Sequence, residues 1–167
     1  MAGPARDEVD TLVDAWRRER PDLDVAPMEV LSRISRLAHH LGRRRATAFS
    51  SHGLEPWEFD VLAALRRSGR PYQLTPGQLL RETLVTSGTM TNRVDRLAGR
   101  DLVNRVDHPG DRRGVLVRLT NQGRQTVDAA LADLLEAERA MLDGLSDTDR
   151  NQLVGVLRQL LARGDTG

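Results

Sequence analysis

Residues 84–120 decide the fold, and their sequence is LVTSGTMTNRVDRLAGRDLVNRVDHPGDRRGVLVRLT. The first part predicts a helix that Thr86 or Ser87 caps. Its apolar residues are spaced by four, three and one positions and form one stripe: Met90, Val94, Leu97 and Ala98. The other faces carry side chains able to bond to base edges or phosphates: Ser87, Thr89, Thr91, Asn92, Arg93 and Arg96. A merely solvated amphipathic helix would show the same pattern.

A β-hairpin is predicted directly after this helix. Two β-prone runs, Leu102–Val106 and Val115–Leu119, flank a turn at residues 107–114 that is rich in Pro, Gly and Asp. Arg112 and Arg113 are adjacent at the tip, where their charges repel each other. A narrow minor groove attracts arginine and would explain the pair. A solvated hairpin tip is the alternative interpretation.

A second short helix is predicted upstream, at residues 74–80. Thr75 is suited to the N-cap and Pro76 to the first helical position. A turn near residues 84–86 would join the two helices. The order of helix, turn, helix and hairpin predicts a winged helix-turn-helix.

These residues resemble the MarR family of bacterial transcription regulators. The matching segments are the helix at 87–97, the run Leu102–Arg105, the wing Asp111–Arg113 and the closing Leu119–Thr120. The resemblance implies a homodimer that binds a palindromic DNA operator and usually represses. In the wing, it implies that Arg113 enters the minor groove, that Asp111 braces it and that Arg112 lies nearer the phosphates.

The rest of the chain predicts helices on both sides of the DNA-binding part. They cover about 7–20, 27–51 and 57–67, then 121–144, with Asn121 as N-cap, and a last helix from 146 onwards. The last helix has six apolar residues within the nine positions 153–161, more than one surface stripe needs. A second copy of the chain is the expected partner of that surface, with packing inside one chain as the alternative.

The expected fold class is α+β, mostly α, with one structural domain overall. The N-terminal and dimerisation helices would occupy 1–54, the winged helix-turn-helix 55–120, and the C-terminal dimerisation helices 121–167.

Charge is unevenly placed along a chain whose net charge is only +1. Residues 84–120 hold seven arginines and four aspartates, a net of +3, and residues 33–45 hold five arginines and no acid, a net of +5. Local basic patches of this kind can bind phosphate without a high overall charge. Solvated basic faces are also common, so the patches only support the DNA-binding interpretation.

Several classes of function find no support in the sequence. There is no cysteine for a thiol switch, no cluster typical of a metal site, and no catalytic or phosphate-loop motif. The prediction is a cytoplasmic regulator that is not an enzyme, needs no cofactor and has no membrane segment. A winged-helix module that binds only proteins is the rival from another class.

Four residues match the branch of the family that senses urate or similar organic anions through an extra N-terminal helix. The resemblance implies that Trp16 and Arg105 hold the ligand, with Asp60 and Arg93 as a relay. An anion at Arg105 would repel Asp60, disturb its pairing with Arg93 and shift the recognition helix. Salicylate-like aromatic carboxylates are candidate effectors beside urate.

Overall fold

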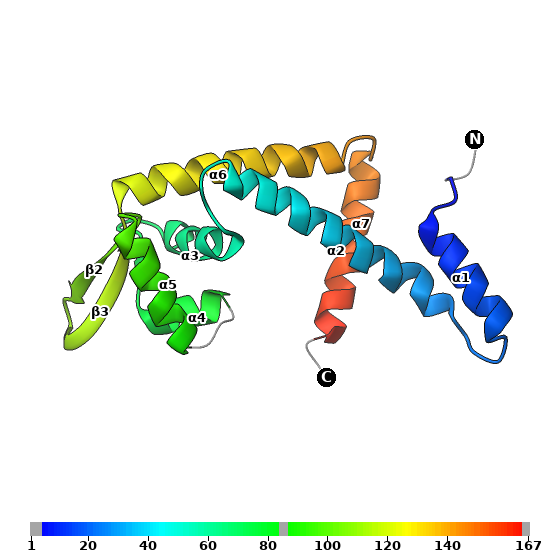
Figure 1. The fold of residues 1–167 in the computed structure, drawn as a ribbon, viewed down its shortest axis with the longest axis horizontal. Coiled ribbons are helices and arrows are strands. Elements are labelled where there is room, and N and C mark those ends of the chain that lie inside the picture. The colour runs from blue at the N-terminus through cyan, green and yellow to red at the C-terminus, as the bar shows by residue number, and fades with distance from the viewer. Residues whose placement is uncertain (1–4, 84–86, 165–167) are drawn as a thin grey trace.

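The computed structural model describes residues 5–83 and 87–164, except for the side chains at 87, 111–113 and 164. Seven helices and a small sheet lie within these ranges (Figure 1). The predicted class, α+β and mostly α, is confirmed. The predicted turn at 84–86 and its capping residues Thr86 and Ser87 lie outside the described part.

Two N-terminal helices precede the winged part, close to the predicted positions. Helix α1 spans Glu8–Glu19 and α2 spans Ala26–Ser50. Helix α1 lies against the first half of α2, and Val9 and Val13 are buried there together with Val25. These three valines form a core separate from the main one, so within the described ranges α1 is held mainly by α2.

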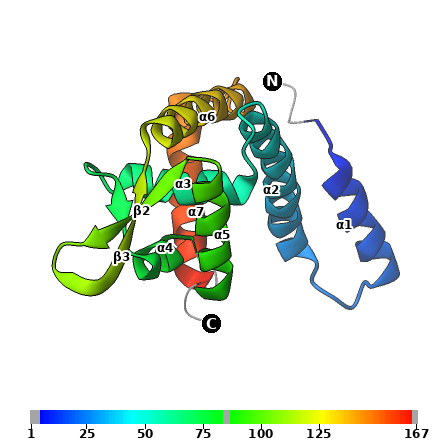
Figure 2. The same cartoon turned by 60° about the vertical axis from the view of Figure 1, so that its left-hand side comes forward.

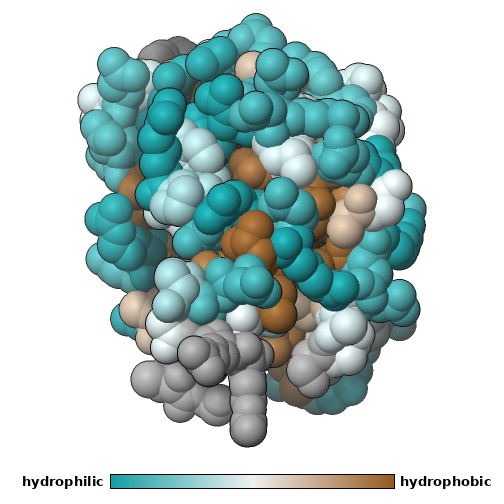
Figure 3. Space-filling model, turned by 90° about the vertical axis from the view of Figure 1, so that its left-hand side faces the viewer, coloured by the Kyte–Doolittle hydropathy of each residue, from teal (hydrophilic) through white to brown (hydrophobic). Residues whose placement is uncertain are grey.

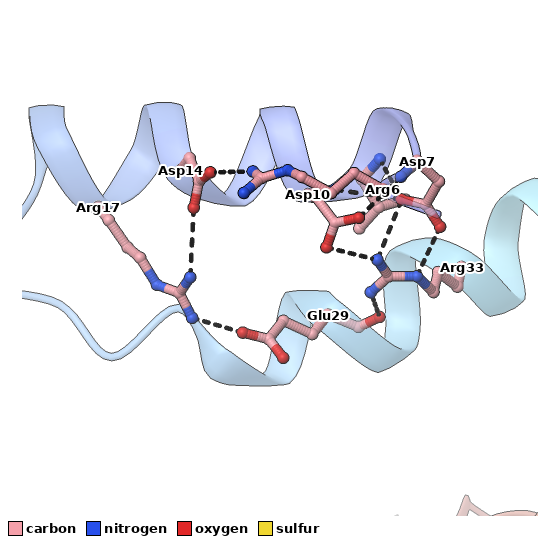
Figure 4. Close-up of polar contacts among 8 residues, drawn as sticks. Arg6, Asp7, Asp10, Asp14, Arg17, Glu29 and Arg33 are labelled. Carbon is pink, nitrogen blue, oxygen red and sulfur yellow. Dashed lines mark hydrogen bonds and ion pairs between the residues drawn. The ribbon is translucent and has the colours of Figure 1, made fainter. Parts of the chain in front are cut away.

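Ion pairs add to the contact between α1 and α2 (Figure 4). The Arg33 guanidinium lies 2.8 Å from both Asp7 and Asp10, and Arg36 pairs with Glu8. The hydrogen bond from Arg33 holds the pKa of the Asp7 carboxyl below its usual value. The basic patch expected at 33–45 is therefore smaller than the sequence suggested, because two of its five arginines neutralise acids of α1.

The winged helix-turn-helix forms as predicted, with one additional strand. Its elements are α3 Pro56–Arg67, β1 Gln73–Leu74, α4 Pro76–Thr83, α5 Ser87–Gly99, β2 Val103–His108 and β3 Asp111–Leu119. The sheet is antiparallel with the order β1-β3-β2. Strand β1 was not predicted, since two residues are too short to show an alternating pattern.

The hairpin differs from the prediction at its tip. Residues 107–108 and 111–114, expected in the turn, belong to β2 and β3, and only Pro109 and Gly110 separate the strands. The pairing is irregular between Asp107 and His108. Backbone hydrogen bonds between the strands overrode the turn propensity of the aspartates and glycine, and the wing is longer as a result.

One core lies between α3, α4, α5, the sheet and α6, which spans Asn121–Met141. Phe49 from the end of α2 stacks on Phe59 of α3, with ring centroids 4.0 Å apart. The N-cap of α6 is Thr120 and not Asn121, because the Thr120 hydroxyl accepts a hydrogen bond from the Gly123 backbone N–H. Helix α6 ends at Met141, slightly earlier than predicted.

The last helix, α7, spans Asp147–Gly164 and leaves apolar side chains exposed. The Ser146 hydroxyl accepts a hydrogen bond from the Asp149 backbone N–H and so caps the start of α7. No helix in the described ranges has the length and apolar character needed to cross a membrane.

Candidate DNA interface and effector residues

Helix α5 buries one face and presents the opposite face to solvent, as predicted. Met90, Val94 and Leu97 are at most 2% exposed and pack into the main core. The exposed residues include the predicted base-reading positions Thr89, Thr91, Asn92 and Arg96. The Ser87 side chain lies outside the described part. The burial of the stripe fixes which face of α5 is offered to a ligand.

A buried acid holds the C-terminal end of α5 against the start of α3. The Glu58 carboxylate is 2% exposed and accepts hydrogen bonds from the Glu55 backbone N–H at 2.9 Å and from Arg100 at 2.6 Å. Arg100 follows the last residue of α5 and also donates to the Gly53 carbonyl at 2.8 Å. One guanidinium thus ties the recognition helix to the turn between α2 and α3.

Two arginines of α5 lie over one tryptophan. The Cζ atoms of Arg93 and Arg96 are 5.2 and 4.8 Å from the ring centroid of Trp57, which stands in the first turn of α3. The Trp57 indole N–H donates to Glu55, and this bond holds the pKa of the Glu55 carboxyl below its usual value. Five side chains line a cleft of about 270 Å³ that we call the recognition cleft: Trp57, Thr89, Asn92, Arg93 and Arg96.

For the three wing residues, the structure describes the position of the backbone. Asp111, Arg112 and Arg113 begin β3, directly after the Pro109-Gly110 tip, while their side chains lie outside the described part. The end of the molecule that carries the hairpin is mostly hydrophilic, with a few apolar side chains near its middle (Figure 3). Such a surface suits a polar ligand better than an apolar one.

The four expected effector residues do not form one site within a single chain. Arg105 of β2 pairs with Asp95 of α5 at 2.7 Å. Trp16 belongs to α1, and both ribbon views show α1 at the opposite end of the molecule from the hairpin (Figures 1 and 2). Its side chain is half-exposed. Within one chain, Trp16 and Arg105 therefore do not contribute to the same site.

The expected ion pair between Asp60 and Arg93 is not formed. Asp60 is exposed and has no ion pair within the described ranges, whereas the Arg93 guanidinium stacks on Trp57. A delocalised guanidinium is weakly hydrated and favours an aromatic face, which explains this preference.

The sequence did not predict a role for five residues of this region: Glu55, Trp57, Glu58, Asp95 and Arg100. Trp57 and Glu55 meet arginines about 40 positions away, as in the 41-residue separation of Glu55 and Arg96. Asp95 was treated only as part of the helix. No local pattern in the sequence indicates such contacts.

Known proteins agree with this architecture. The MarR family model matches residues 52–114, from the turn before α3 to the first part of β3. The transcriptional regulator PecS of Dickeya dadantii is 37% identical over 150 residues, which cover 90% of each chain. The transcriptional repressor NicR of Pseudomonas putida is 29% identical over 143 residues, covering 83% of this chain and 89% of NicR.

A solved structure adds a neighbour whose DNA binding is known to be regulated. Bordetella bronchiseptica BpsR, from work on regulation of its DNA binding by 6-hydroxynicotinic acid, has a TM-score of 0.59 and 26% identity. The alignment covers 77% of this chain and 98% of that one. These relatives are regulators and not enzymes. The polar face of α5, the hairpin beside it and the near-complete alignment with PecS thus place this chain in the MarR family of DNA-binding transcriptional regulators.

Proposed function

We propose that this regulator is a repressor that binds a pseudo-palindromic operator as a homodimer and is released by a small organic anion. The observation that carries the DNA-binding part is the exposed polar face of α5 opposite its buried stripe. A helix of this shape fits a major groove, and the hairpin would meet the adjacent minor groove. The repressor assignment draws on the likeness to NicR.

Exposed apolar side chains support the homodimer. On α2, Val30, Leu31 and Leu37 are each more than half exposed. On α7, the exposed apolar side chains are Leu153, Val154, Val156, Leu157 and Leu161. Helix α7 makes few contacts with the rest of its own chain. An apolar surface of this extent on two neighbouring helices is typical of an interface between subunits.

Each subunit would read one half-site. Base edges would be contacted by Ser87 and by four exposed polar side chains of α5: Thr89, Thr91, Asn92 and Arg96. Arg113 would enter the minor groove with Asp111 beside it, and Arg112 would contact phosphates. Phosphate contacts position the protein while base contacts give sequence preference.

Footprinting on DNA from the gene's own upstream region tests this function. We expect a protected segment with two related half-sites about one DNA turn apart, roughly 34 Å, because a two-fold dimer presents its recognition helices at that spacing. Binding should weaken steeply with salt. Sedimentation should show a dimer at micromolar concentration.

The variant Arg113→Ala on the same DNA should lose about 1–3 kcal/mol of binding free energy. Arg18→Ala, at an exposed position in the last turn of α1, is the matched control and should bind normally. A single asymmetric half-site or a monomer would contradict the proposal. DNA binding without sequence preference would favour the rival interaction module, and an unaffected Arg113→Ala would remove that residue from the interface.

The proposed effector is a small organic anion such as urate or an aromatic carboxylate like salicylate. 6-Hydroxynicotinic acid, which regulates the neighbour BpsR, is itself an aromatic carboxylate. Arg105 is the proposed anchor, with Trp16 of a second copy completing the site. Because Arg105 already pairs with Asp95, an incoming anion would compete with Asp95 for the guanidinium. Repulsion between the bound anion and the displaced Asp95 carboxylate would then push α5 away from β2 and shift the recognition helix.

Titration of urate, salicylate and a tricarboxylate against the protein–operator complex tests the response. Arg105→Ala should abolish release by the anion. Its operator affinity without ligand should fall by no more than about fivefold, because an exposed ion pair contributes about 1 kcal/mol or less.

Two further variants separate the possible relays. Asp95→Asn should blunt release if Asp95 transmits the signal, and Asp60→Asn should then respond normally. The reverse result would restore the relay through Asp60. A wild-type complex indifferent to all the anions, or a normally responding Arg105→Ala, would leave no role for Arg105 in sensing.

A further inference from the structure

We propose that Trp57 is a positioning residue for DNA reading: it holds Arg93 and Arg96 ready on the base-reading face of α5. This inference rests on the proposed DNA-binding function and assigns a role to a residue outside the recognition helix. It is carried by the recognition cleft, in which both guanidiniums lie within 5.2 Å of one indole ring centroid.

The arrangement brings like charges together. Arg93 and Arg96 are three positions apart, so they are neighbours on the surface of α5 and repel each other. The negative face of the indole ring attracts both guanidiniums, since cation–π contacts are strongest with tryptophan. The Glu55 carboxylate lies 3.5 Å from the Arg96 guanidinium. It also accepts the hydrogen bond from the Trp57 indole N–H, which fixes the orientation of the ring. Charge and stacking therefore favour a defined position for two long side chains.

A defined position matters for reading guanine. An arginine that pairs with guanine must present two N–H groups at once to O6 and N7. A free arginine loses rotamer freedom when it does so, and an arginine that is already ordered loses less. Asn92 and Thr89 line the same cleft, so the ordered guanidiniums lie among the other predicted reading residues.

The anchor of Trp57 is rigid. It stands in the first turn of α3, whose N-cap is Glu55, and the buried Glu58 bonds to the Glu55 backbone N–H in the same turn. Arg100 ties Glu58 to the end of α5. The platform and the arginines it holds are thus parts of one connected unit, and motion of α3 relative to α5 is opposed.

The test compares operator and scrambled duplexes with the full-length protein and Trp57 variants. Trp57→Leu should lower the operator-to-scrambled affinity ratio about tenfold, because two partly exposed cation–π contacts are lost. The affinity of Trp57→Leu for scrambled DNA should stay within about twofold of the wild-type value, and the salt dependence of that binding should be the same. Trp57→Phe keeps an aromatic face and should recover most of the ratio. Tyr72→Leu is the control, because it removes the stacking of Arg66 on an aromatic ring away from α5.

A double-mutant cycle shows whether Trp57 acts through the arginines. In the Arg93→Ala/Arg96→Ala background, Trp57→Leu should change the ratio by less than twofold. Replacing guanines of the operator with 7-deazaguanine, which lacks N7, should likewise shrink the effect of Trp57→Leu. Three outcomes would overturn the positioning role. The affinity ratio could stay unchanged or rise in Trp57→Leu, it could fall equally in Tyr72→Leu, or the losses from Trp57→Leu and from the two arginine substitutions could simply add. A wild-type protein that does not distinguish the duplexes would overturn the proposed function itself.

Discussion

The substitution Gly123→Ala is expected to destabilise the protein by about 4 kcal/mol. A Cβ atom at this position would lie 2.0 Å from the backbone oxygen of Leu102 and 2.9 Å from its carbonyl carbon. Backbone atoms cannot rotate away as a side-chain tip can, so the first turn of α6 must move from the start of β2. Overpacking of this kind costs about 3 kcal/mol, and loss of an N-cap adds about 1.

The cap is at risk because it belongs to the same close contact. The Thr120 N–H donates to the Leu102 carbonyl at 3.1 Å, and the Thr120 hydroxyl accepts from the Gly123 N–H at 2.9 Å. Moving α6 outward strains both bonds. Since α6 follows the wing directly in sequence, the variant should also bind the operator less tightly.

Urea unfolding at one protein concentration measures the effect, because subunit association makes stability depend on concentration. Gly42→Ala is the matched control: Gly42 lies within α2, and a Cβ there meets nothing within 4 Å. That variant should gain up to about 1 kcal/mol from helix propensity. A Gly123→Ala variant as stable as the wild type would show that this junction tolerates a methyl group.

The second large effect is expected for Arg100→Ala, which should lose about 3 kcal/mol of unfolding free energy. The variant leaves the Glu58 carboxylate, 2% exposed, with the Glu55 N–H as its remaining hydrogen-bond donor. Removing one partner of a buried ion pair typically costs 3–5 kcal/mol. The lower end applies because the Arg100 side chain is 42% exposed and water can reach the gap.

A second substitution separates the buried charge from lost packing. Glu58→Gln combined with Arg100→Ala removes the charge while the amide oxygen can still accept from the Glu55 N–H, so the double variant should recover about half of the loss. Arg139→Ala breaks an exposed pair with Glu136 and should cost less than about 0.5 kcal/mol. A double variant no more stable than Arg100→Ala would mean that the buried charge is not the cause.

Much of the fold was predictable because it is encoded locally. The stripe of Met90, Val94 and Leu97 repeats with the helical period, and its burial fixes the polar face of α5. The hairpin was predictable from two β-prone runs around Pro109 and Gly110, although turn propensity placed its tip too broadly. Capping was predicted one residue late at α6, where Thr120 and Asn121 are both good N-caps and only the path of the chain chooses between them.

The sequence by itself therefore determined the family, the helices and the face of α5, since each depends on spacing within a few residues. The tertiary structure alone decided which distant groups meet. It paired Arg100 with Glu58, 42 positions away, placed Arg93 on Trp57 instead of beside Asp60, and matched Arg105 with Asp95. It also separated α1, and with it Trp16, from the hairpin of the same chain. Such contacts arise when the core packs and brings the exposed ends of long side chains together, and no local period in the sequence records that geometry.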